Sequence, residues 1–95
     1  MTLDELEEFF DKHNNEFLEF DRVEIKQSNR SDLHAFLLLD RLFPSNDDIV
    51  SCADYGEIWL DVTPTELAET ASEQQIIELI RCGVRYSDCS LKMFV

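Results

Sequence analysis

Three cysteines and two histidines are the residues of this 95-residue chain best suited to catalysis or metal binding. A thiol nucleophile needs a neighbouring base, usually histidine, and a zinc site needs about four convergent ligands. Cys52, Cys82 and Cys89 show no Cys-x-x-Cys spacing, and His13 and His34 are not paired in the sequence. We therefore expect free thiols in a reducing compartment, with no catalytic residue, no metal site and no cofactor.

The carboxylates also fail to single out a reaction. An acid–base pair requires a pocket that separates two pKa values, and the sequence indicates no such pocket. The segment Asn46-Asp47-Asp48 is only a fragment of a calcium-binding loop. Gly56 and Gly83 are the only glycines, which excludes a glycine-rich phosphate loop. The sequence predicts a protein that is not an enzyme.

Charge is the strongest signal in the sequence. The chain carries 21 Asp and Glu residues against 8 Lys and Arg residues, a net charge of −13. Residues 1–24 carry −7 and residues 47–78 carry −9, whereas residues 25–46 and 79–95 carry +1 and +2. No Lys or Arg lies between Arg41 and Arg81. Because repulsion of this size destabilises a compact state, segregated charge favours a binding role over solubility alone.

Composition limits the class of protein. The length fits a single domain, residues 1–95, and 44% apolar residues are too many for a disordered acidic tail. The longest apolar run, Ala35–Leu39, is far too short to span a membrane, and the N-terminus lacks the features of a signal peptide. We expect a cytoplasmic protein that binds neither nucleic acid nor membrane directly, because both are anionic.

Capping signals predict three of the helices. Thr2 with Glu5, Thr63 with Glu66 and Ser72 with Gln75 each form a capping box, and Gly83 is suited to the end of the last helix. Ser31 marks a further start. Its helix body, Leu33 to Phe43, is apolar nearly all round, which predicts a central buried helix ended by Pro44.

Alternating polarity predicts the strands, namely a short strand at Arg22–Gln27, a hairpin of Ile49–Ala53 with Glu57–Val62, and a terminal hairpin of Val84–Tyr86 with Leu91–Val95. For the first hairpin we expect a three-residue loop, 54–56, that pairs Cys52 with Ile58 and Val50 with Leu60. The predicted fold is α+β, with a small antiparallel sheet (hairpin 49–62 plus a C-terminal strand or hairpin) packed with three to four short helices.

Trp59, the only tryptophan, marks one candidate binding patch. Alternation places it on one face with Glu57 and Asp61, where an exposed Trp would act as an interface anchor. In the alternative, a helix covers this face and Trp59 belongs to the core. The partner-binding residues we predict are Glu57, Trp59 and Asp61 with Asp47 and Asp48 nearby, and the helix face of Glu7, Glu8 and Asp11 as a second candidate.

An acidic helix face can imitate nucleic acid. Duplex DNA carries one charge per roughly 1.7 Å of axis, and carboxylates three or four residues apart on a helix lie about 5–6 Å apart. Asp4, Glu8 and Asp11 would form such a row. In size and charge the chain is similar to small anti-restriction and anti-CRISPR proteins of phages, several of which imitate nucleic acid. The resemblance implies an inhibitor that occupies the basic surface of a nuclease or another nucleic-acid-binding effector.

A second hypothesis is an adaptor or a subunit of a homo-oligomer, whose acidity serves solubility. Its interface would be apolar, either the outer hairpin face or the terminal strand Leu91–Val95 acting as a free sheet edge. A steep loss of partner affinity with rising salt would favour the inhibitor over the adaptor.

Overall fold

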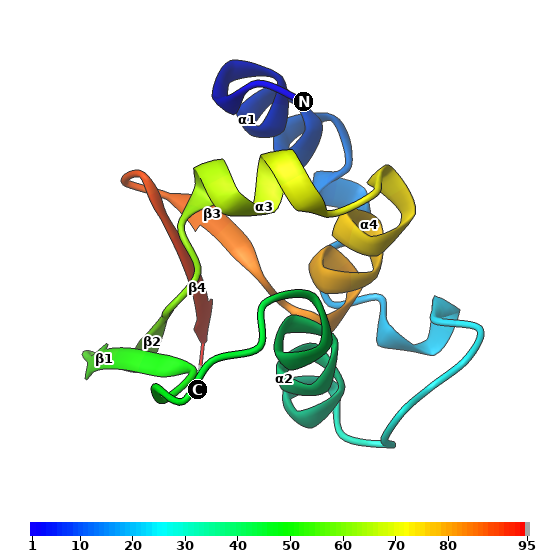
Figure 1. Cartoon of the computed structure of the whole chain (residues 1–95). Coiled ribbons are helices and arrows are strands. Elements are labelled where there is room, and N and C mark those ends of the chain that lie inside the picture. The colour runs from blue at the N-terminus through cyan, green and yellow to red at the C-terminus, as the bar shows by residue number, and fades with distance from the viewer. Residues whose placement is uncertain (95) are drawn as a thin grey trace.

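Four helices pack on a four-stranded antiparallel sheet, which confirms the predicted α+β class (Figure 1). The structure is a computed structural model that describes residues 1–94. The helices are α1 (Leu3–Lys12), α2 (Ser31–Leu42), α3 (Pro64–Thr70) and α4 (Glu73–Cys82). Two short 3₁₀ turns, η1 (Asn14–Glu16) and η2 (Phe20–Arg22), follow α1. The strands are β1 (Val50–Asp54), β2 (Glu57–Leu60), β3 (Arg85–Ser87) and β4 (Ser90–Phe94).

The three predicted capping boxes are all present, at the starts of α1, α3 and α4. At α1, for example, the Glu5 amide donates to Thr2 Oγ1 at 3.2 Å, and the Thr2 amide donates to Glu5 Oε1 at 2.9 Å. These bonds satisfy amides that an uncapped helix leaves without partners. Gly83 ends α4 with a φ of 104°, a conformation that glycine adopts without steric cost.

The sheet has the strand order β1-β2-β4-β3. Its inner face, formed by Ile58, Leu60, Leu91 and Met93, packs against buried side chains of all four helices. Figure 1 shows the helices gathered on this side of the sheet. We call the opposite face, which carries Glu57, Trp59, Arg85, Lys92 and Phe94, the outer face.

The predicted register of the first hairpin is wrong for the residues next to the turn. Val50 does pair with Leu60, but Cys52 lies opposite Trp59 rather than Ile58. The turn has two residues, Tyr55 and Gly56, both with positive φ (48° and 77°), as in the turns that match the twist of a hairpin. A register shift between Val50 and Cys52 then restores the pairing of Val50 with Leu60.

The two-residue turn places Asp54 directly opposite Glu57, a like-charge pair that normally destabilises a hairpin. The register is tolerated here because the Arg85 guanidinium forms an ion pair with Glu57. Arg85 belongs to β3, the edge strand at the other end of the sheet from β1. The sequence of the hairpin alone gave no sign of this partner, because Arg85 lies 28 residues further along the chain.

The strand predicted at Arg22–Gln27 is also wrong: this segment contains the end of η2 and then irregular chain. An ion-pair network holds it in place instead. Glu16 accepts from Arg81 Nε at 2.7 Å and pairs with Arg22 Nη1 at 2.7 Å, while Arg81 also donates to the Arg22 carbonyl oxygen. The alternating polarity of six residues gives no information about their contacts with α4, and in the structure Arg81 of α4 fixes this segment.

Helix α2 is not buried all round, contrary to prediction. Leu33 and Leu37 are 42% and 40% exposed, because α2 packs mainly against α4 and turns one side to solvent. Its buried polar residue is His34, whose Nδ1 accepts from the Gln27 amide at 3.0 Å. A ring that accepts through Nδ1 carries its proton on Nε2, which lies 3.2 Å from Glu78 Oε1.

The C-terminal hairpin forms as predicted, but β4 is not a free edge. It pairs with β2 through Glu57–Trp59 and with β3 through its other side. The adaptor hypothesis therefore loses the edge that it proposed, within the described part of that strand; Val95 lies outside the described residues. No helix in residues 1–94 has the length and hydropathy needed to cross a membrane.

Candidate acidic interface

Asp61 borders two depressions of the surface, one of which is lined by further carboxylates. It follows β2, and its backbone amide donates to the Ile49 carbonyl oxygen at 2.6 Å, which fixes it beside the chain that leads into β1. On one side it shares a shallow depression with Asp40, Asp47 and Asp48. The structure thus brings together three of the predicted partner-binding residues and adds Asp40, which the sequence analysis did not select.

On its other side Asp61 lines a groove of about 330 Å³ between the starts of α1 and α3 and the β3–β4 turn. Leu3, Pro64 and Tyr86 supply much of its apolar wall. The groove exists because α1 and α3 pack together, with Leu6 of α1 and Leu67 of α3 both buried in the shared core. It therefore joins a helix of the first acidic block to a segment of the second.

Two carboxylates of α1 lie near enough to this groove to affect the pKa of a residue in its wall. Burial raises the pKa of the Tyr86 hydroxyl, and the charges of Cys89, Glu7 and Asp4 raise it further. Glu7 and Asp4 are therefore close enough to place negative charge at the groove wall. We name Asp4, Glu7, Asp61, Asp40, Asp47 and Asp48 together the acidic strip. No Lys or Arg of the described residues forms an ion pair with any of them.

The other two predicted residues of α1, Glu8 and Asp11, are exposed. Asp11 lines a different groove, of about 230 Å³, with Phe10, Asn14 and Arg85 among its other wall residues. Glu8 lies on the solvent side of α1, opposite the buried Leu6 and Phe10. The second predicted patch is therefore divided, with Glu7 in the acidic strip and Asp11 at a separate groove.

Glu57 and Trp59 lie among cations on the outer face. Glu57 pairs with Arg85, and Lys92 Nζ lies 4.8 Å from the centroid of the Trp59 ring. Lys92 is only 5% exposed and its ammonium also pairs with Asp88 at 3.3 Å. Trp59 is half-buried, so it is neither a fully exposed anchor nor a core residue under a helix. The charge of Glu57 is compensated, unlike the charges of the acidic strip.

Sequence reasoning missed Arg85 and Lys92 because their partners depend on the order of the strands. Each base alternates with apolar residues in the terminal hairpin, which is a signal for one face of a sheet. The sequence does not indicate which strand lies next to β4. In the structure β2 lies next to it, and this pairing places Trp59 opposite Lys92.

The three cysteines differ in accessibility: Cys52 and Cys89 are exposed and Cys82 is buried. Burial raises the pKa of the Cys82 thiol to about 12, and the charge of Glu78 acts in the same direction. Such a thiol is unreactive at neutral pH. Within residues 1–94, no group of three His, Cys, Asp or Glu side chains is arranged to hold a metal ion.

Comparisons with known protein families, with curated proteins and with solved structures found no match to this chain. The arrangement of charge is therefore the main guide to its function.

Proposed function

We propose that this protein is a non-enzymatic, acidic binding module that occupies the basic surface of a nucleic-acid-binding protein, such as a nuclease or effector. The observation that carries the proposal is the acidic strip. Five of its six carboxylates come from the two acidic blocks, Asp40 comes from α2, and none of the six forms an ion pair within the described chain.

The distribution of the few bases supports this function. Arg22 and Arg81 are held by Glu16, Arg85 by Glu57 and Lys92 by Asp88. These four bases lie in the segment after α1, in α4 and on the outer face of the sheet. The other four, Lys12, Lys26, Arg30 and Arg41, form no ion pair with the acidic strip among the described residues. Uncompensated like charges destabilise a fold, whereas a complementary basic partner relieves the repulsion and accelerates association.

Inhibition by nucleic-acid mimicry is the mechanism that we favour within this class. A strip of fixed carboxylates competes with phosphates for Lys and Arg side chains, and binding then falls steeply with salt. Several phage anti-restriction and anti-CRISPR proteins, and the acidic partners of basic nucleases, are similar in this charge-based competition. We place the protein in the cytoplasm on the same reasoning, since that is where such partners act.

The test is capture of partners on the immobilised protein at about 50 mM and about 500 mM NaCl, with and without competing duplex DNA. We expect bound proteins that DNA displaces and that high salt releases. The variant Asp47→Asn/Asp48→Asn/Asp61→Asn should lose them. The matched control Asp21→Asn/Glu24→Gln/Glu73→Gln, which removes the same charge away from the strip, should keep them. Equal losses in both variants, or capture that ignores salt and DNA, would contradict the proposal.

A further inference from the structure

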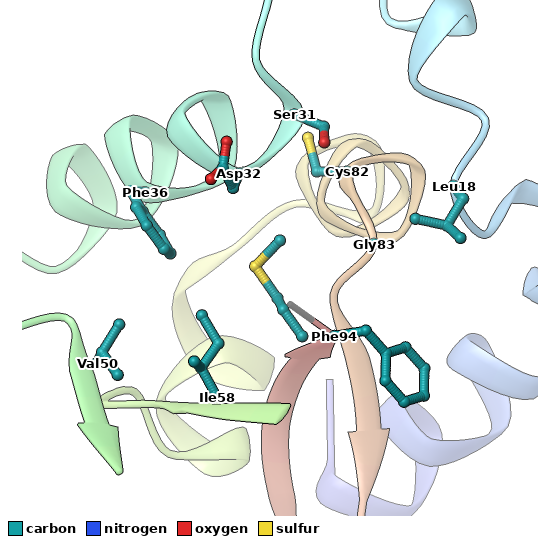
Figure 2. Close-up of a pocket in the computed structure, with 10 residues that line it drawn as sticks. Leu18, Ser31, Asp32, Phe36, Val50, Ile58, Cys82, Gly83 and Phe94 are labelled. Atoms are coloured by element: carbon teal, nitrogen blue, oxygen red, sulfur yellow. The ribbon is translucent and has the colours of Figure 1, made fainter. Parts of the chain in front are cut away.

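A separate cavity lies away from the acidic strip, between α2, the C-terminal end of α4 and the inner face of the sheet. It has a volume of about 600 Å³. Figure 2 shows Phe36, Val50 and Ile58 on one side of it and Cys82, Gly83 and Leu18 on the other. A cavity of this size with mostly apolar walls falls within the range of small-molecule sites.

The cavity is open to solvent, since Asp32, Leu18 and Phe94 in its lining are all exposed. A small molecule can therefore enter it without a change of the fold, and its apolar walls offer burial to the apolar part of such a molecule.

Leu18, at the mouth of the cavity, is in a conformation that L residues avoid. Its φ is 63°, and its side chain is 62% exposed, so burial does not offset the backbone strain. The Leu18 amide donates to the Ile80 carbonyl oxygen at 3.2 Å, which holds the residue beside α4. Strain of this kind costs about 1–2 kcal/mol and is concentrated at binding sites.

Gly83 shows that Leu18 lies directly against the cavity wall. A Cβ atom at Gly83 would lie 2.8 Å from Leu18 Cδ2, closer than van der Waals contact allows. The absence of a side chain at this position lets Leu18 rest over the end of α4. Leu18 therefore adds an exposed apolar side chain to the lining of the cavity.

The polar groups of the cavity come from the first turn of α2. Asp32 and Ser31 line it, and Figure 2 shows both at the start of this helix. Asp32 Oδ1 accepts from the Leu33 amide at 2.8 Å, and the carboxylate has no ion pair among the described residues. The one charged group of the cavity is therefore negative, in a protein of net charge −13. Fatty acids, nucleotides and other anions are disfavoured on both counts.

We propose that this cavity binds a small organic cation, with an apolar body between Phe36, Ile58 and Leu18 and an ammonium group at Asp32. The site is independent of the acidic strip and of the proposed function. Its specificity comes from a charge-assisted hydrogen bond to Asp32 combined with apolar burial of the rest of the ligand.

The test uses three probes of one shape: 4-phenylbutylamine, 4-phenylbutanol and 4-phenylbutyrate. Each is titrated into the isotope-labelled protein, and amide chemical shifts are followed by NMR. We expect the amine to shift the amides of Asp32, Phe36, Ile58 and Gly83, with an affinity at least about ten-fold above that of the carboxylate. Shifts confined to the acidic strip, equal affinities for the amine and the carboxylate, or no binding by any probe would overturn the proposal.

Two substitutions locate the binding groups. Asp32→Asn should weaken binding of the amine about ten-fold and leave the alcohol unaffected, whereas the exposed control Asp21→Asn should change neither. Leu18→Asn should weaken all three probes without loss of stability, because asparagine tolerates positive φ better than leucine. Binding of the amine that is unchanged by Asp32→Asn would exclude Asp32 as its partner and with it the proposed ligand class.

Discussion

The ammonium of Lys92 lies over the ring of Trp59, 4.8 Å from the ring centroid, on neighbouring strands of the outer face. Arg85 makes the equivalent contact with Phe94, at 4.5 Å from its ring centroid. The bases of the C-terminal hairpin thus stabilise the sheet through aromatic rings as well as through Glu57 and Asp88. This explains why the least acidic part of the chain is not available to neutralise the rest.

Replacement of Trp59 tests this arrangement. We expect Trp59→Ala to lower the free energy of unfolding by about 2 kcal/mol, because it removes the ring that covers the buried Lys92 side chain. Trp59→Phe keeps a ring and should cost less than about 1 kcal/mol. Urea unfolding followed by circular dichroism measures both. Equal losses in the two variants would show that an aromatic ring at this position gives no benefit, which would contradict the stabilising contact between ring and ammonium.

The ionic strength of the buffer should change the stability of the free protein. Because the acidic strip lacks basic partners, we expect the Tm to rise by about 4–8 °C, roughly 1 kcal/mol, between about 20 mM and about 300 mM NaCl. The variant Asp47→Asn/Asp48→Asn/Asp61→Asn should start from a higher Tm and respond less to salt. A salt response unchanged by these substitutions would place the repulsion elsewhere in the molecule.

The strip variants separate stability from binding. The same three substitutions that weaken partner capture are expected to stabilise the fold, whereas a substitution in the core would lower both. The carboxylates of the strip are then explained by a role outside folding, which is the physical basis of the proposed function.

Glu16 should make a pH-dependent contribution to stability. A hydrogen bond from Arg81 is the main cause that lowers the pKa of this carboxyl group, so its folded pKa lies below its unfolded value. Its contribution is therefore fully present above the unfolded pKa and is lost as the pH falls through the folded pKa. Wild-type protein should exceed Glu16→Gln in stability at pH 7, and the difference should shrink below about pH 4.5.

Urea unfolding of both proteins at several pH values measures this difference. Comparison of the two is essential, because protonation of the unpaired carboxylates relieves repulsion and changes the stability of each protein in the opposite direction. Asp21→Asn serves as the control for loss of one exposed charge. A difference between wild type and Glu16→Gln that stays constant from pH 7 to pH 3 would contradict the role assigned to the Arg81 contact.

Thiol reactivity should divide the cysteines into two groups. Cys52 and Cys89 are exposed, whereas burial raises the pKa of Cys82 to about 12. We expect a chromogenic disulfide reagent at pH 8 to titrate two thiols in the native protein and a third only in urea. The variant Cys82→Ala should show two thiols under both conditions. Rapid reaction of three thiols in the native wild type would contradict the burial of Cys82.

Local signals in the sequence predicted most helices and strands but not which of them lie next to one another. The capping boxes at Thr2, Thr63 and Ser72 are local chemistry, and each one marked a helix start correctly. The hairpin register failed because Arg85 stabilises a pairing that looked unfavourable in isolation. Segment 22–27 failed because α4 determines its conformation through Arg81.

The candidate site was predictable to a similar extent. The separation of charge into two blocks was visible in the composition of the segments. The structure places Asp47, Asp48 and Asp61 around one depression, and their role in binding a partner stays a prediction. That Asp61 also borders a groove with α1 depends on the packing of α1 against α3, which no local pattern encodes. The cavity beside Leu18 could not be predicted for the same reason, since its walls come from six separate segments.

The ion pair between Glu16 and Arg81 has a consequence for synthesis of the chain. Glu16 and Arg81 are 65 residues apart, and Leu18 is likewise bonded to Ile80. A nascent chain emerges with its N-terminus first, so the segment after α1 has no docking surface until α4 has left the ribosome. Closing so large a loop is entropically unfavourable before the core exists. We therefore expect the segment after α1 to remain undocked during translation until α4 has emerged.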